Sequence, residues 1–140
     1  MSLTALALAL SLATAPVLAA ADLSDVQWRN RVLVVFADAG SAHYVRQLGL
    51  LEAVRDGLAE RDMLVLGVEG QSVTTLYGDV SGFVVAAVRN TAGGNGADPF
   101  EAVLIGKDGG VKQRWSAPVI PEALFDIIDS MPMRAGEMRR

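Results

Sequence analysis

LIGKDGGVK, residues 104–112, is the stretch that decides the fold. An apolar run precedes the Asp-Gly pair and a second short run follows it, which predicts two strands over 100–105 and 111–115. Asp108 and Gly109 tolerate positive φ, so we expect a tight primed turn between the strands. The stretch therefore predicts an antiparallel β-hairpin.

Upstream of the hairpin, residues 31–37 read RVLVVFA, a continuous apolar run typical of a buried central strand. Ser41 follows as a helix N-cap, and apolar residues then recur at steps of three and four from 42 to about 60. Residues 63–68 form a second apolar run. A strand, a long helix and a strand predict a right-handed parallel crossover.

Between the crossover and the hairpin, residues 83–88 have the β-branched content of a strand, but a crossover element is needed there, so we expect a short helix over about 80–90. A glycine-containing loop over 91–98 follows. Pro121 is well placed to open a closing helix over about 122–130. The predicted class is α/β and thioredoxin-like, in the order β-α-β-α-β-β-α, with a central mixed sheet flanked by helices.

Residues 1–21 contain no charged side chain and end in small residues, which is typical of a secretory signal peptide. An uncleaved N-terminal anchor is the alternative. Residues 22–140 then form a single domain of about 119 residues, with no membrane span after signal cleavage. We expect an exported protein, periplasmic or secreted.

The composition excludes several classes of function. The chain has no cysteine, so thiol-disulfide oxidoreductase and thiol peroxidase chemistry are excluded. His43 is the only histidine, and no acidic loop has metal-ligand spacing, so we expect no metal and no cofactor. The formal net charge of -4 gives no reason to expect nucleic acid as a partner.

Three segments carry a family resemblance: Arg61-Asp62, the LIGKDGGVK hairpin, and residues 124–134, which end in MPMR. With these motifs the chain, over about 28–138, resembles the domain of unknown function 4174 family. That family is similar to the C-terminal domains of secreted vertebrate sushi-repeat proteins and of a coiled-coil-containing matrix protein. The resemblance implies a thioredoxin-like fold, often exported, in a family whose activity is not established.

In thioredoxins the reactive cysteine lies between the first strand and the long helix, which here is the segment 38–43. This segment offers Asp38, Ser41 and His43 instead. One hypothesis is a hydrolase that uses these three residues as its catalytic group. The competing interpretation is that Ser41 serves only as the helix N-cap.

Basic side chains near the hairpin are the candidate binding residues. Lys112 and Arg114 alternate along one strand and are expected to share a face, which Lys107 at the turn could join; Arg134 lies beyond the closing helix. The alternative is a solvated sheet edge protected by positive charge. A ligand bound at these residues should be anionic.

Two further residue types suggest packing. The methionines at 131 and 133 are expected to fill the end of the core, and Trp28 and Trp115 to pack in the core or at its rim. Together these patterns predict an exported, cysteine-free, non-redox binding module whose partner is an unknown protein or anionic ligand in the cell envelope. The non-thiol enzyme remains the alternative.

Overall fold

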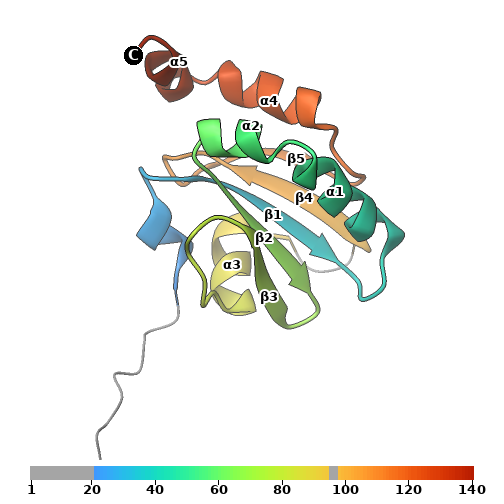
Figure 1. Cartoon of the computed structure of the whole chain (residues 1–140). Helices are drawn as coiled ribbons and strands as arrows, with labels where there is room; N and C mark the ends of the chain where they lie inside the picture. Colours follow the sequence, from blue (N-terminus) through green and yellow to red (C-terminus); the bar gives the residue numbers. More distant parts are fainter. Residues whose placement is uncertain (1–20, 95–97) are drawn as a thin grey trace, which may run out of the picture.

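The computed structural model describes residues 21–94 and 98–140. Over these ranges, five strands form one sheet with helices on both faces (Figure 1). The predicted signal peptide lies outside the described residues except for Ala21. The elements are η1 Leu23–Val26, β1 Arg31–Ala37, α1 Ala42–Glu52, α2 Arg55–Glu60, β2 Met63–Glu69, β3 Ser72–Tyr77, α3 Val85–Ala92, β4 Phe100–Ile105, β5 Val111–Trp115, α4 Pro121–Asp129 and α5 Pro132–Met138.

The sheet has the strand order β3-β2-β1-β4-β5, with β1 at its centre. β1 and β2 are parallel, joined by the α1–α2 crossover, while β1–β4, β2–β3 and β4–β5 are antiparallel. A parallel pair, an antiparallel hairpin and a closing helix give the predicted thioredoxin-like arrangement, which is confirmed. β3 adds one strand to it at the edge.

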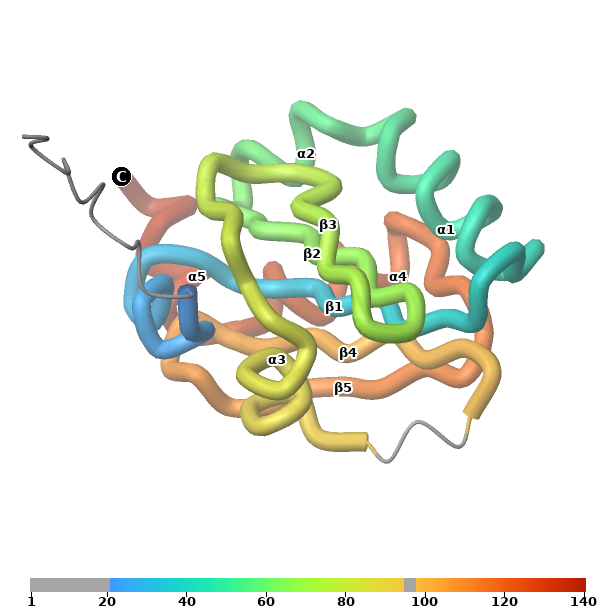
Figure 2. Tube along the Cα trace, turned by 90° about the horizontal axis from the view of Figure 1, so that it is seen from below, coloured from blue at the N-terminus to red at the C-terminus, as the bar shows by residue number. Residues whose placement is uncertain are grey.

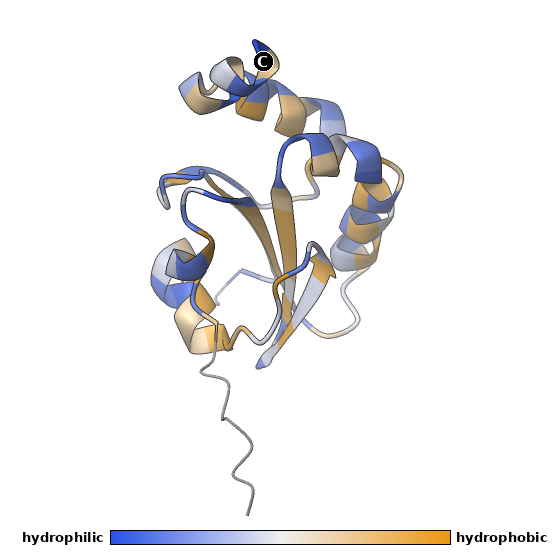
Figure 3. Cartoon of the chain, turned by 60° about the vertical axis from the view of Figure 1, so that its left-hand side comes forward, coloured by the Kyte–Doolittle hydropathy of each residue, from blue (hydrophilic) through white to orange (hydrophobic). Residues whose placement is uncertain are grey.

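Two apolar layers cover the sheet. Alternate residues of β1, such as Leu33 and Val35, pack under α1, α2 and α4, whereas Val34 and Phe36 pack under η1 and α3. All seven β1 residues are buried because both faces of this central strand are covered. Figure 3 shows the apolar central strands between helices whose outer faces are polar.

The four strands expected from the sequence are found with nearly the expected bounds, and the closing helix begins at Pro121 as predicted. The prediction of a single long helix is wrong in one respect, because the helix breaks at Ala53–Val54 into α1 and α2. The break lets α2 settle against α4. A Cβ on Gly57 would lie 2.7 Å from the Phe125 ring, so any larger residue would force this ring to shift.

The segment between β2 and β4 differs most from the prediction. Residues 72–77 form β3, which turns back from β2 at Gly70 with φ of 58°, and the expected helix over 80–90 is instead α3 at Val85–Ala92. β3 escapes sequence analysis because its side chains are only half buried and carry little apolar signal. α5 was also not expected; Pro132 opens it immediately after α4.

Candidate functional site

One end of the sheet gathers η1, the β4–β5 turn and α5, as Figures 1 and 2 both show. We call this region, residues 23–31, 106–112 and 131–138, the hairpin end. Contacts join its parts: the Trp28 N–H donates to the Lys107 carbonyl at 2.6 Å, and the Gln27 amide donates to the Asp108 carbonyl at 2.8 Å. The candidate residues predicted at the turn are therefore held against neighbouring segments by hydrogen bonds.

The turn has a three-residue loop and not the expected two-residue primed turn. The Gly106 N–H donates to the Gly110 carbonyl at 2.9 Å, and the Gly109 N–H donates to the Gly106 carbonyl at 3.0 Å. Of the loop residues only Gly109 has positive φ, 84°. A three-residue loop that ends in a glycine in the left-handed region is the next most common hairpin connection after the two-residue turns.

Asp108 organises the outer side of the turn. Its carboxylate accepts the Gly110 N–H at 3.0 Å and the Lys112 ammonium at 2.7 Å. The Lys112 hydrogen bond, followed by the Gly110 N–H, lowers the pKa of Asp108. Because both Lys112 and Asp108 remain in contact with solvent, this rim pair is weak and easily opened.

Lys107 lies inside the molecule, although a turn lysine is expected on the surface. Its side chain is 9% exposed, and its ammonium bonds Asp62 at 2.8 Å and Glu137 at 2.9 Å. These carboxylates come from the α2–β2 turn and from α5. Lys107 is thus a structural cation joining three segments.

Arg31, the first residue of β1, shares Glu137 with Lys107. Its guanidinium makes a two-pronged contact with the Glu137 carboxylate, at 3.1 and 2.6 Å, and also donates to the Arg61 carbonyl at 3.0 Å. Arg31 is 1% exposed, and its Nε has no hydrogen-bond partner among the described residues. The Arg31 hydrogen bonds, supported by Lys107 and opposed by burial, lower the pKa of Glu137 to about 2.

Arg134, one helical turn before Glu137 on α5, is buried in a second group of ion pairs. It bonds Asp129 at 3.0 Å and the Glu60 carboxylate at 2.9 Å. Arg61 also holds Asp129, at 2.9 and 3.0 Å, and its hydrogen bond is the largest cause of the lowered pKa of Asp129. Arg134 therefore anchors α5 to α2 and α4 and presents no free charge to solvent.

Arg114 is separated from the other basic residues. It bonds Glu101 at 3.0 Å and the Ala92 carbonyl at the end of α3, whereas Lys112 lies beside α4. The expectation that Lys112 and Arg114 share a face is wrong, because a β-bulge between Leu104 and Ile105 shifts the register of β5. The predicted basic surface is therefore divided.

A pocket of about 370 Å³ opens between the hairpin and the α4–α5 elbow. Arg31, Lys107 and Lys112 form its polar wall, and Ile127, Met131 and Met133 are among its apolar lining. The predicted core-filling role is confirmed for Met131, which packs against the core, but Met133 is exposed. Methionines at such a rim adapt to different apolar surfaces.

The tryptophans also divide. Trp115 packs against the core as expected, whereas Trp28 is 62% exposed. Trp28 has φ of 69°, a left-handed backbone conformation that bulky residues rarely adopt. Sequence analysis gave Trp28 only a packing role. It missed Arg31 and Glu137 because nothing in the sequence around Arg31 points to a partner 106 positions away.

The opposite end of β1 holds Asp38, Ser41 and His43. The Ser41 hydroxyl accepts the Tyr44 N–H at 3.2 Å, which is the predicted N-cap bond. The His43 ring lies edge-on to Phe100, with ring centres 5.5 Å apart. Among these three described residues no side-chain hydrogen bond forms, so the structure does not bring them together as a catalytic group.

Within residues 21–94 and 98–140, His, Asp and Glu side chains form no group able to hold a metal ion. No helix found in the same ranges is long and apolar enough to cross a membrane. The site chemistry that these residues offer is therefore paired charge, exposed apolar side chains and backbone held under strain.

Comparison with known proteins places the chain among relatives. The sequence model described as "Domain of unknown function (DUF4174)" matches residues 22–137. The chain is 32% identical over 125 residues to "Sushi repeat-containing protein SRPX" of Homo sapiens, covering 86% of this chain and 27% of that protein. It is 29% identical over 133 residues to "Coiled-coil domain-containing protein 80" of Danio rerio, covering 83% and 15% respectively.

The chain thus spans about a quarter or less of the length of these curated relatives. Among solved structures, the one described as the crystal structure of Trgpx in apo form aligns with a TM-score of 0.48 at 22% identity, over 86% of this chain and 87% of that one.

Proposed function

This chain belongs to the family of domains of unknown function DUF4174, and from that membership we propose that it is an exported, non-redox domain that binds another protein through the hairpin end. The absence of cysteine supports the non-redox part. The charge-free leader over residues 1–21 supports export.

Trp28 is the observation that carries the binding proposal. A left-handed backbone costs a bulky residue about 1–3 kcal/mol, and such strain persists where the surroundings enforce it, often at functional positions. Here the Lys107 carbonyl holds the Trp28 N–H at 2.6 Å, while the side chain stays 62% exposed. Neither core packing nor backbone preference explains a tryptophan at this position.

Other exposed apolar side chains lie on the segments that make up the hairpin end. Met133 and Met138 lie on α5, and Val111 starts β5 directly after the turn. Exposed tryptophan and methionine with a charged rim, here Lys112 and Asp108, is the usual composition of a protein interface. We expect the partner to place an apolar side chain in the pocket between the hairpin and the α4–α5 elbow, and a carboxylate or other hydrogen-bond acceptor against Lys112.

Site-specific photo-crosslinking tests this function in the cell that makes the protein. A photoreactive phenylalanine analogue at position 28 should yield a discrete protein adduct. The same analogue at Val45, an exposed apolar position on α1, should not. Equal adducts at both positions, or none at position 28, would contradict the proposal.

Trp28→Gly provides the matched binding variant. Glycine adopts positive φ freely, so the variant should be as stable as wild type, or up to about 1 kcal/mol more stable. It should nevertheless lose the partner that position 28 cross-links. A stable Trp28→Gly protein that retains the partner in co-purification would remove Trp28 from the interface.

A further inference from the structure

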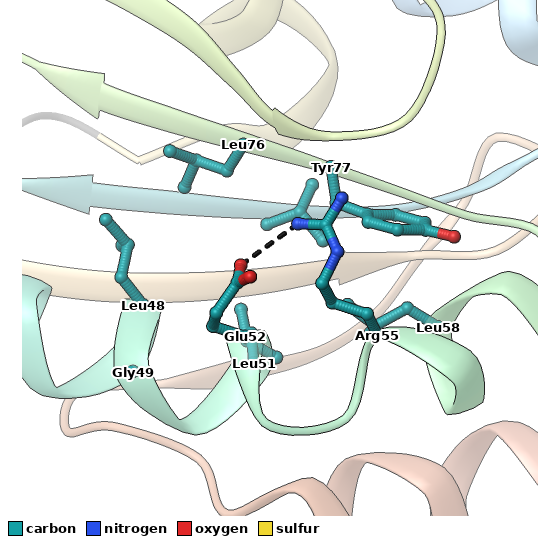
Figure 4. Close-up of a pocket in the computed structure, with 9 residues that line it drawn as sticks. Leu48, Gly49, Leu51, Glu52, Arg55, Leu58, Leu76 and Tyr77 are labelled. Carbon is teal, nitrogen blue, oxygen red and sulfur yellow. Dashed lines mark hydrogen bonds and ion pairs between the residues drawn. The ribbon is translucent and has the colours of Figure 1, made fainter.

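A second pocket, of about 330 Å³, lies away from the hairpin end, between the α1–α2 break and the edge of the sheet (Figure 4). We call it the α1–β3 groove. Its walls are apolar and mostly aliphatic, consisting of Leu48, Leu51, Leu58, Val65, Leu76 and Tyr77. Such a concave, apolar site with few polar groups is the usual form of a small-molecule site.

Gly49 leaves free space at the wall of the groove, at a cost to the fold. It lies inside α1, where glycine destabilises a helix by about 0.5–1 kcal/mol relative to alanine. Among the residues that the structure describes, no atom of another segment lies within 4 Å of the place its Cβ would take. Packing therefore does not require this glycine, in contrast to Gly57, whose Cβ would strike Phe125.

One cation stands over the apolar walls. The Arg55 guanidinium lies 5.1 Å from the centre of the Tyr77 ring and pairs with Glu52 at 3.0 Å, as Figure 4 shows. The Arg55 and Glu52 side chains are 50% and 68% exposed, so their pair contributes little and is easily opened. Stacking on Tyr77 keeps Arg55 in place when Glu52 is displaced.

From these features we infer that the α1–β3 groove binds a free single-chain amphiphile whose aliphatic part enters the groove and whose carboxylate replaces Glu52 on Arg55. The aliphatic lining selects a chain, and the one cation at the rim selects its anionic end. Arg55 also borders a polar hollow of about 540 Å³, which leaves solvent access for the headgroup. This site is independent of the hairpin end.

Calorimetric titration of the whole chain with straight-chain carboxylates, from hexanoate to hexadecanoate, tests the inference. Affinity should rise about fourfold per methylene until the groove is filled and should then level off. Decanol and decyltrimethylammonium should bind about twofold to fivefold more weakly than decanoate, because neither can form the solvent-exposed pair with Arg55. Equal affinity for decanol and decanoate would overturn the assignment of the headgroup.

Two substitutions at one position give the matched variants. Gly49→Leu places a side chain in the groove and should abolish decanoate binding, whereas Gly49→Ala adds only a methyl group and should retain it. Both should melt at or above the wild-type temperature, since both residues favour helix more than glycine does. Unchanged decanoate binding by Gly49→Leu would place the ligand elsewhere.

Arg55→Gln tests the cation. Decanoate affinity should fall about twofold to fivefold while decanol affinity stays unchanged. Binding to phosphatidylglycerol vesicles with no binding of free decanoate would favour a membrane surface and overturn the proposal. Failure of Trp28→Gly to alter protein binding would leave the groove unaffected, so the two proposals fail separately.

Discussion

β1 begins with Arg31, a buried cation held by Glu137. At its other end β1 leads into the largely exposed segment 38–43, which is held by the Ser41 cap bond and by backbone hydrogen bonds of Asp38 and Ser41. Redox members of this fold class place their chemistry at the second end, at the start of the long helix. In this chain the buried charge, the strained backbone and the exposed aromatic are at the first end. The difference teaches that this chain concentrates its buried charge and backbone strain at the end of β1 opposite the segment that carries redox chemistry elsewhere in the fold class.

The largest expected effect comes from removing Arg31. Arg31→Met leaves Glu137 with only part of its compensating charge, so the free energy of unfolding should fall by about 3–5 kcal/mol in urea denaturation. Arg31→Met/Glu137→Leu replaces both ions with apolar groups and should recover most of this loss. If the single variant lost less than about 1 kcal/mol, the buried ion pairs would contribute no more to stability than a solvent-exposed pair, which would contradict the prediction.

Acid should weaken the same end next. The pKa of Glu137 is about 2 in the folded chain against an ordinary 4.5. Its stabilisation is therefore complete above pH 4.5 and is lost as the pH falls toward 2. Because the Glu137 side chain is still 18% exposed, we expect a loss of about 2 kcal/mol, less than the full shift implies.

Urea denaturation at a series of pH values measures this loss. Glu137→Gln should be less stable at neutral pH but should show a flatter decline in acid. Some decline should remain, since Asp129 also has a lowered pKa and contributes with the same sign. Parallel curves for the variant and wild type would assign the acid sensitivity to other carboxylates.

At the opposite end, Ser41→Ala should cost about 1 kcal/mol, because it removes the acceptor for the Tyr44 N–H. Ser41→Thr keeps a hydroxyl and should retain most of the stability. The loss should add to that of Arg31→Met, since the two sites share no partner. Thermal unfolding of the single and combined variants checks both values, and strong coupling would contradict the independence of the two ends.

The smallest effect is expected at the rim of the hairpin. Lys112→Ala breaks only the solvent-exposed pair with Asp108, so stability should change by less than about 0.5 kcal/mol and little more at low salt. Lys107 lies on the other side of the β4–β5 turn and is buried between Asp62 and Glu137. Lys107→Ala should therefore lower the free energy of unfolding several times more in the same urea experiment. Similar losses would mean that burial does not separate the two lysines.

Sequence patterns predicted the central strands because the buried strands β1 and β2 are continuous apolar runs. Such a run can be recognised from the local sequence alone. They failed for β3, whose exposed and half-buried side chains carry little apolar signal, and for the α1–α2 break. Lys107 and Arg134 look like surface residues by type alone. Their burial follows from carboxylates at Asp62, Asp129 and Glu137, and only the folded chain brings these into contact.

The Arg31–Glu137 contact also determines when, during synthesis, the fold can be completed. The two residues are 106 positions apart, so at about 5–20 residues per second a ribosome adds Glu137 roughly 5–20 s after Arg31. Until then the sheet can assemble only around an arginine that lacks its partner. The Arg31–Glu137 contact, and with it the completed fold, can therefore form only after synthesis has passed residue 137.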